Sequence, residues 1–136
     1  MLGRVRLYLC RHAHAGPGDP DDLRELTSRG RAEARELATR LGGERRPPAL
    51  VLTSPLLRAR QTAAVVADAL RAELRVEPRL APGATASDVT AVLAATAVET
   101  VATIGHQPDC SGIALSFAGR DPGFPTGGML ALDLES

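Results

Sequence analysis

The fold of this chain is decided by the stretch RVRLYLCRH, residues 4–12. Its apolar residues run far enough to predict a buried β-strand over 4–10, and the run stops abruptly at an Arg-His pair. The next segment, 11–26, contains closely spaced Gly and Pro residues and is predicted to be a loop. In open α/β sheets ligands bind at the carboxyl ends of the strands. Arg11 and His12 are therefore candidates for a reaction centre.

Strand and helix patterns alternate along the rest of the chain. Further strands are predicted over 49–53, 74–78, 99–104 and 129–134. The helices are predicted to start at Thr27 or Ser28, at Ser54-Pro55, at Ser87, and at Pro108 or Asp109. Gly42-Gly43 ends the first of these helices, Ser54 caps the second with Pro55 at its first position, and the last runs to about Phe117.

This alternation predicts an α/β fold, namely a three-layer α/β/α sandwich with a mainly parallel central sheet. The segment 119–128 contains no helical pattern, so the final strand is expected to lie at an edge and to pair antiparallel. A chain of 136 residues is long enough for one buried core. We therefore expect a single domain over residues 1–136.

The composition narrows the classes of partner. Sixteen basic and sixteen acidic residues balance, which indicates neither a nucleic-acid nor a membrane surface. All the basic residues are arginine, which excludes lysine-based Schiff-base chemistry. Three aromatic residues are too few for stacking on single strands, and two cysteines are too few for a disulfide scaffold. No signal-peptide pattern is apparent. We expect a cytoplasmic monomer.

Polar residues follow three of the predicted strands. Besides Arg11 and His12, the segment SPLLRARQT follows at 54–62 and a Gly-His pair at 105–106. Parallel strands bring all three segments to one edge of the sheet. Arg58 and His106 each lie near a helix N-terminus, which favours anions, and the arginine fork suits phosphate oxygens. Two arginines and two histidines here predict a site for a tetrahedral dianion.

Two other chemistries fit less well. A cysteine-based phosphatase would need an arginine six residues after Cys10, where the chain has Gly16. Metal hydrolysis could use His12 and His14, with His106 and Asp109 as further ligands. Enzymes with that pattern generally use a large barrel that this length cannot form. The arginines would also repel a cation, so no metal is expected.

Three motifs carry a resemblance to a known family. The segments Arg11-His12-Ala13, 54–62 and Gly105-His106-Gln107-Pro108 resemble, in order and spacing, those of the histidine phosphatase superfamily, also called phosphoglycerate mutase-like. The resemblance extends from residue 5 to about 134. The short chain, the alanine after His12 and the segment 125–128 are most similar to SixA-type phosphohistidine phosphatases.

The resemblance implies a role for each matching residue. His12 would be the nucleophile, and Arg11, Arg58 and His106 would bind the phosphoryl group and stabilise the transition state. No metal or organic cofactor is implied. We also expect Gln107 to contact the phosphate, His14 to be exposed, and Ser54 and Thr62 to have structural roles.

One departure from the superfamily bears on the substrate. Many members carry a glutamate acid after the third strand, but residues 77–83 contain no clear equivalent; Glu77 or Asp88 could take its place. An imidazole leaves phosphorus more easily than an alkoxide. The missing acid therefore favours a phosphoramidate over sugar phosphates and argues against mutase activity.

These observations predict a metal-independent phosphatase that hydrolyses phosphohistidine in proteins through a phosphohistidine intermediate on His12. Its partner would be a phosphorelay or phosphocarrier protein, or a small phosphorylated substrate. Two alternatives stay open. One is a general small-molecule phosphomonoesterase of the same superfamily, and the other is a catalytically weak phosphate-binding module.

Overall fold

The computed structural model describes residues 3–135. Within them one mixed sheet has the strand order β3-β2-β4-β1-β5. The strands are β1 (Arg4–Arg11), β2 (Leu50–Thr53), β3 (Glu73–Val76), β4 (Thr100–Gly105) and β5 (Met129–Glu135). The α-helices are α1 (Ser28–Gly42), α2 (Leu57–Leu70), α3 (Ala86–Thr96) and α4 (Asp109–Ala118), and the 3-10 turns are η1 (Asp21–Leu23) and η2 (Pro78–Leu80).

Strand pairing brings two of the predicted polar segments side by side. β1 pairs parallel with β4, and the register places Arg11 opposite Gly105. β2 pairs parallel with β3 and β4, with Thr53 opposite Ile104. β5 pairs antiparallel with β1 at the edge of the sheet. The prediction of a mainly parallel sheet with an antiparallel edge strand is thus confirmed.

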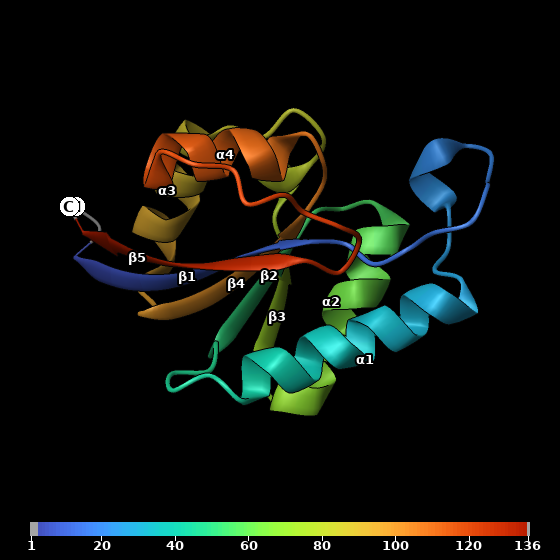
Figure 1. Ribbon diagram of the computed structural model, residues 1–136, viewed down its shortest axis with the longest axis horizontal. Coiled ribbons are helices and arrows are strands. Elements are labelled where there is room, and N and C mark those ends of the chain that lie inside the picture. Colours follow the sequence, from blue (N-terminus) through green and yellow to red (C-terminus); the bar gives the residue numbers. More distant parts are fainter. Residues whose placement is uncertain (1–2, 136) are drawn as a thin grey trace.

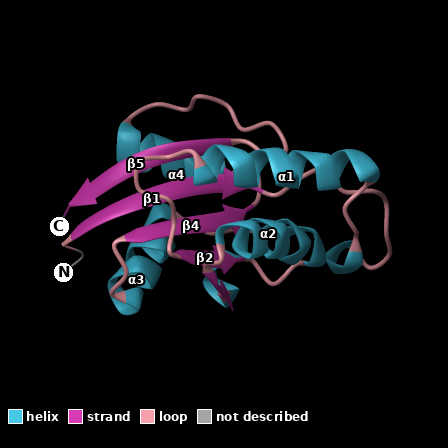
Figure 2. Ribbon diagram, turned by 90° about the horizontal axis from the view of Figure 1, so that it is seen from below, coloured by secondary structure: helices cyan, strands magenta, loops and turns pink. Residues whose placement is uncertain are grey.

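The sheet is covered by helices on both faces. α1 and α2 lie side by side on one face, and α3 and α4 cover the other (Figures 1 and 2). Alternate residues of β1 serve the two cores, since Leu7 and Leu9 pack with α3 and α4, whereas Tyr8 and Cys10 pack with α1 and α2. This double burial explains the nearly continuous apolar run of β1. The predicted three-layer α/β/α architecture is confirmed.

Helix starts differ from the prediction at two places. α2 begins at Leu57, with Leu56 as N-cap and no side-chain cap, because the Ser54 hydroxyl bonds the Leu56 backbone and His106 instead. α3 is capped by Thr85 rather than Ser87, through a capping box with Asp88. The loop after β1 also contains η1 and a short bridge between Ala15 and Leu26. Thr27 caps α1 as predicted.

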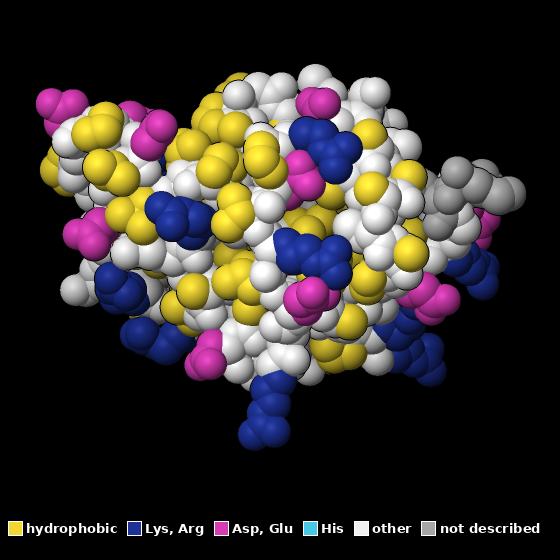
Figure 3. All heavy atoms as spheres, turned by 180° about the vertical axis from the view of Figure 1, so that it is seen from behind, with side chains coloured by type: hydrophobic (Ala, Val, Ile, Leu, Met, Phe, Trp, Pro, Cys, Tyr) yellow, Lys and Arg dark blue, Asp and Glu magenta, His cyan; other side chains and the backbone are white. Residues whose placement is uncertain are grey.

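The surface reflects the balanced charge of the sequence. Seen from behind, arginine side chains alternate with aspartate and glutamate side chains, and neither sign forms a continuous patch on this face (Figure 3). Among the helices within residues 3–135, none is long and apolar enough to cross a membrane.

Gly30 marks the closest approach of α1 to the loop that follows β1. A Cβ at Gly30 would lie 1.9 Å from the carbonyl oxygen of His14 and 2.9 Å from its carbonyl carbon, so the backbone itself would have to move. We expect Gly30→Ala to lower the free energy of unfolding by about 2 kcal/mol or more, as for severe overpacking. Urea denaturation measures this change.

The matched control is Gly112→Ala in α4, where an added Cβ would meet nothing within 4 Å. A glycine inside a helix is less favourable than alanine by about 0.5–1 kcal/mol, so this variant should be at least as stable as the wild type. Equal stability of the two variants would contradict the close approach at Gly30.

Candidate active site

The three polar segments meet in one pocket at the carboxyl ends of β1, β2 and β4. Its volume is about 410 Å³. All five predicted site residues line it: Arg11, His12, Arg58, His106 and Gln107. The further lining residues are His14, Ala15, Asp21, Arg24, Pro82 and Thr126. The predicted convergence therefore exists, and the loop after β1 completes the pocket together with Pro82 and Thr126.

Within residues 3–135 one ring nitrogen of His12 has no hydrogen-bond partner. The residue is 7% exposed, and its backbone N–H donates to the Gly105 carbonyl at 2.9 Å. The ring Nδ1 lies 2.7 Å from the Ala13 carbonyl oxygen. A carbonyl only accepts, so Nδ1 carries the hydrogen and the lone pair is on Nε2. Burial lowers the pKa of His12 to about 4, with Arg58 and Arg11 contributing. Near neutral pH the ring is therefore uncharged.

The backbone beside His12 is held from α2. Thr62 accepts a hydrogen bond from the Ala13 N–H at 3.0 Å, and its hydroxyl donates to the Arg58 carbonyl at 2.8 Å. Thr62 thus connects the turn after His12 to the helix that carries Arg58. The expected structural role of this residue agrees with these contacts.

His106 lies beside His12, with 5.1 Å between the ring centroids. It is 3% exposed, and its Nε2 is 2.7 Å from the Ser54 hydroxyl. That hydroxyl accepts from the Leu56 N–H at 3.2 Å, so its own hydrogen is free to be donated to Nε2. His106 would then hold its hydrogen on Nδ1. Burial, followed by His12 and Arg58, lowers the pKa of His106 to about 4.

Arg58 and Arg11 are only partly satisfied by protein groups. Arg58, at the start of α2, donates from Nη1 to the Asp21 carbonyl at 3.0 Å and from Nη2 to the Asp21 carboxylate at 3.1 Å. Arg11 donates from Nη1 to the Phe124 carbonyl at 2.9 Å. The Nε atoms of both arginines are buried without a partner in the described part of the chain.

Three residues that line this pocket each carry a buried nitrogen without a protein partner among the described residues. Arg11 Nε, Arg58 Nε and His106 Nδ1 come from three different segments and have no partner within residues 3–135. A buried donor without a partner costs about 1–3 kcal/mol, so three in one pocket indicate a ligand that accepts hydrogen bonds. Their cationic surroundings favour an anionic acceptor, and a tetrahedral oxyanion offers several oxygens.

The acidic residues are arranged differently from the expectation. Glu77 forms an ion pair with Arg79 at 2.9 Å, and Asp88 belongs to the capping box of α3; neither lines the pocket. Asp21, which belongs to no motif of the sequence, does line it. A hydrogen bond from Arg24, with a further contribution from Arg58, holds the pKa of Asp21 below its usual value. Its position in the loop directly after His12 was the available signal.

Two other expectations need correction or qualification. His14 is half-buried rather than exposed, because its Nδ1 bonds the Thr27 hydroxyl at 2.8 Å at the start of α1. Gln107 lines the pocket, but its amide already bonds the Ser111 hydroxyl and N–H at 2.8 and 2.9 Å. Phosphate contact by Gln107 stays a prediction.

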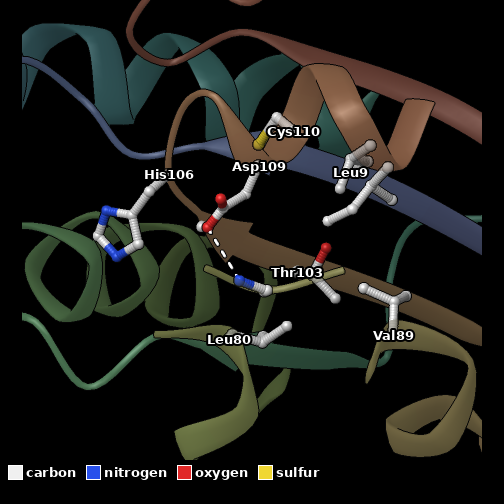
Figure 4. Close-up of a pocket in the computed structure, with 10 residues that line it drawn as sticks. Leu9, Leu80, Val89, Thr103, His106, Asp109 and Cys110 are labelled. Atoms are coloured by element: carbon white, nitrogen blue, oxygen red, sulfur yellow. Dashed lines mark hydrogen bonds between the residues drawn. The ribbon is translucent and has the colours of Figure 1, made fainter. Parts of the chain in front are cut away.

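Asp109, considered above as a possible metal ligand, binds backbone groups instead. Its carboxylate accepts from the backbone N–H groups of Gly83 and Ala84 at 2.9 and 3.2 Å (Figure 4), and so fixes the turn that brings Pro82 to the pocket. Figure 4 also shows the His106 ring lying to the side of a small, mostly apolar cavity behind it. Among residues 3–135 no three His, Cys, Asp or Glu side chains are grouped as metal ligands.

The depressed histidine pKa values predict a specific pH dependence of stability. Above pH 6.5 His12 is neutral in both the folded and the unfolded chain. Between pH 6.5 and about 4 only the unfolded chain takes up the proton, so the free energy of unfolding falls by about 1.4 kcal/mol per pH unit. We expect His12→Asn to reduce the loss between pH 7 and 5 by about 2 kcal/mol. Urea denaturation at both pH values tests this, and an unchanged loss would contradict it.

Comparisons with known proteins agree with this geometry. Residues 7–82 match the model of the histidine phosphatase superfamily (branch 1). The chain is 36% identical over 110 residues to the phosphohistidine phosphatase SixA of Escherichia coli (strain K12), covering 76% of this chain and 68% of that protein. The crystal structure of a SixA protein from Agrobacterium tumefaciens has a TM-score of 0.83 at 31% identity and covers 95% of this chain and 91% of that one.

A further structure, of the protein histidine phosphatase SixA complexed with tungstate, has a TM-score of 0.81 at 28% identity. It covers 96% of this chain and 97% of that chain. The family model spans more than half of the sequence and includes the segments of both His12 and Arg58. This chain belongs to the histidine phosphatase superfamily, branch 1.

Proposed function

We propose that this chain is a metal-independent phosphatase that hydrolyses phosphohistidine in proteins through a covalent intermediate on His12. One observation carries the proposal. A neutral imidazole with a free Nε2 shares a pocket with three buried donors that lack a partner in the described residues. Such a pocket combines a nucleophile with groups suited to the oxygens of a phosphoryl group.

In the first step Nε2 of His12 attacks phosphorus, and the bond from phosphorus to the leaving nitrogen breaks. The bonding electrons go to the leaving imidazole, and a phosphohistidine forms on His12. Arg11 and Arg58 neutralise the charge on the equatorial oxygens, which is the main task of a protein in phosphoryl transfer, and the neutral His106 ring donates a hydrogen bond to one of them. The hydrogen bond from Nδ1 to the Ala13 carbonyl orients the His12 ring and stabilises the positive charge that develops on it during attack.

In the second step water attacks the phosphorus and His12 is the leaving group. Its Nε2 recovers the electron pair, the water oxygen becomes part of the product phosphate, and the water proton is released or retained by that phosphate. The same three cationic or donor groups hold the oxygens in both steps. These steps use only side chains of this chain, so no cofactor is needed.

The acids around the pocket favour a nitrogen leaving group. Glu77 is paired with Arg79, Asp88 caps α3, and Asp21 has a lowered pKa. None is therefore prepared to donate a proton to an alkoxide. An imidazole leaves without such a donor, which supports phosphohistidine over sugar phosphates.

The relatives support the same substrate class. The Escherichia coli relative is named a phosphohistidine phosphatase, and one structural relative is complexed with tungstate, a tetrahedral oxyanion like phosphate. By extension, the partner proposed for this chain is a phosphorylated phosphorelay or phosphocarrier protein. We further propose that it acts on that partner as a cytoplasmic monomer.

Phosphate release from two substrate types tests the proposal. Purified protein is given a phosphorylated histidine-phosphotransfer domain and, separately, a panel of sugar phosphates, each with and without a chelator. We expect kcat/KM to be higher for the phosphoprotein and unaffected by the chelator. A preference for sugar phosphates would favour the phosphomonoesterase alternative, and phosphate binding without turnover would favour the binding module.

A further inference from the structure

We propose that Asp21 recognises the leaving imidazole of the substrate by accepting a hydrogen bond from its ring N–H, and so favours the protonated ring. This inference rests on the proposed function and extends it to the leaving group. It gives the protein a means of activating a phosphoramidate without a general acid.

The depth of the pocket places Asp21 on the leaving-group side. His12 and His106 are 7% and 3% exposed, and the Arg58 side chain is 8% exposed, whereas the Asp21 side chain is 61% exposed. A phosphoryl group held by the buried residues must extend its histidine toward solvent, because that histidine is part of another protein. The turn η1 lies beyond the ends of the strands (Figure 1), and its residue Asp21 lines the same pocket.

Two arginines hold the carboxylate in place. Arg24 donates to Oδ1 at 3.2 Å and Arg58 to Oδ2 at 3.1 Å. Arg24 is itself anchored through Nε to the Gly16 carbonyl at 2.8 Å. A carboxylate has about four lone-pair positions, so acceptor positions are left for a substrate N–H. The group is thus oriented before the substrate arrives.

The charge around the pocket gives this carboxylate a particular function. Three arginines line the pocket, and Asp21 is the one acidic residue among the described lining residues. Without Asp21, the charged side chains lining the pocket would all be positive, and they would repel a protonated phosphoimidazole ring. With Asp21 ionised, the ring cation has a partner within the pocket.

Protonation of the substrate ring makes it a better leaving group. When the second nitrogen of the substrate ring carries a proton, cleavage of the P–N bond returns the electron pair to the first nitrogen and releases neutral imidazole. Without that proton the leaving group would be an imidazolide anion. The proton stays on the ring throughout, so no residue has to donate it.

The test compares Asp21→Asn with the wild type on two substrates. Phosphoimidazole needs a protonated ring, whereas p-nitrophenyl phosphate has a leaving group that needs no proton. We expect Asp21→Asn to lower kcat/KM for phosphoimidazole about tenfold or more, the range for losing one charged hydrogen bond. Activity on p-nitrophenyl phosphate should change less than about threefold. Asp22→Asn, an exposed neighbour in η1 outside the pocket lining, is the matched control and should behave as wild type on both.

The outcomes separate the two proposals. An equal loss on both substrates would mean that Asp21 only positions Arg58, and no loss on either would mean that it does not contact the ring; each overturns the inference and leaves the proposed function standing. A wild-type protein that hydrolyses p-nitrophenyl phosphate but not phosphoimidazole would overturn the proposed function itself.

Discussion

His12→Ala is expected to abolish the phosphorylated enzyme intermediate and to reduce turnover by at least about 10³-fold. Its Nε2 is the only atom that the mechanism uses to form a bond to phosphorus, and removing a nucleophile costs other enzymes up to about 10⁶-fold. The other pocket groups can still bind phosphate, so the variant should retain affinity for an oxyanion. This variant should therefore lose turnover while it keeps its affinity for the oxyanion.

The measurement is trapping of labelled phosphate on the protein. Reaction mixtures are quenched in alkali, where a P–N bond survives, and the label should then be lost on brief acid treatment. His14→Ala provides the comparison, because His14 is the neighbouring imidazole and forms no bond to phosphorus in the proposed mechanism. Label retained by His12→Ala at the wild-type level would refute the assignment of the nucleophile.

Arg58→Ala is expected to have the second largest effect, a loss of about 10³-fold in kcat/KM. Removing one preorganised donor to a developing oxyanion costs about 10²–10³-fold, and arginines that stabilise phosphoryl transfer contribute about 10³–10⁵-fold. The effect should be large because the Arg58 side chain is 8% exposed, so its charge is poorly screened by water.

Arg60→Ala is the matched control for this variant. Arg60 lies two residues along α2 and is exposed, and its side chain bonds the Pro55 carbonyl at 2.9 Å, as expected of a solvated helix arginine. Its replacement should leave kcat/KM within about twofold of the wild type. Circular dichroism and urea denaturation establish that both variants fold. Activity of folded Arg58→Ala within tenfold of the wild type would remove Arg58 from the catalytic set.

Both predictions draw on the same property of the pocket, which is that its histidines are neutral while its arginines are charged. Burial keeps the pKa of His12 and of His106 at about 4. The positive charge that binds phosphate is thus separated from the lone pair that attacks it. A protonated His12 would bind the anion well and could not react.

Much of the fold followed from local patterns. The apolar run of β1, the cap at Thr27 and the glycines that end α1 are properties of a few neighbouring residues, and the structure agrees with each. The alternation of strands and helices was enough for the three-layer architecture, since parallel strands need helical crossovers. The convergence of Arg11, His12, Arg58, His106 and Gln107 followed from that topology and is present in the pocket.

Partners distant in sequence could not be predicted in this way. Ser54 looked like a helix cap, because serine is a common N-cap and Pro55 suits the first helical position. In the structure its hydroxyl bonds His106, 52 residues away, and α2 begins later. The pairing of β2 with β4 brings Ser54 next to His106. The local sequence pattern around Ser54 does not indicate this contact.

The sequence alone therefore determined the order of the elements, the nucleophile candidate and the cationic groups around it. Only the tertiary structure decided which acid accompanies them. Glu77 and Asp88 were candidates because of their position in the chain. In the structure Glu77 forms an ion pair with Arg79, and Asp88 belongs to the capping box of α3. Asp21 reaches Arg58 across 37 residues, because the loop after β1 folds back over α2. The spacing of residues along the chain specifies helices and strands. Which charged side chains pair across the pocket depends on how the loops pack in the tertiary structure.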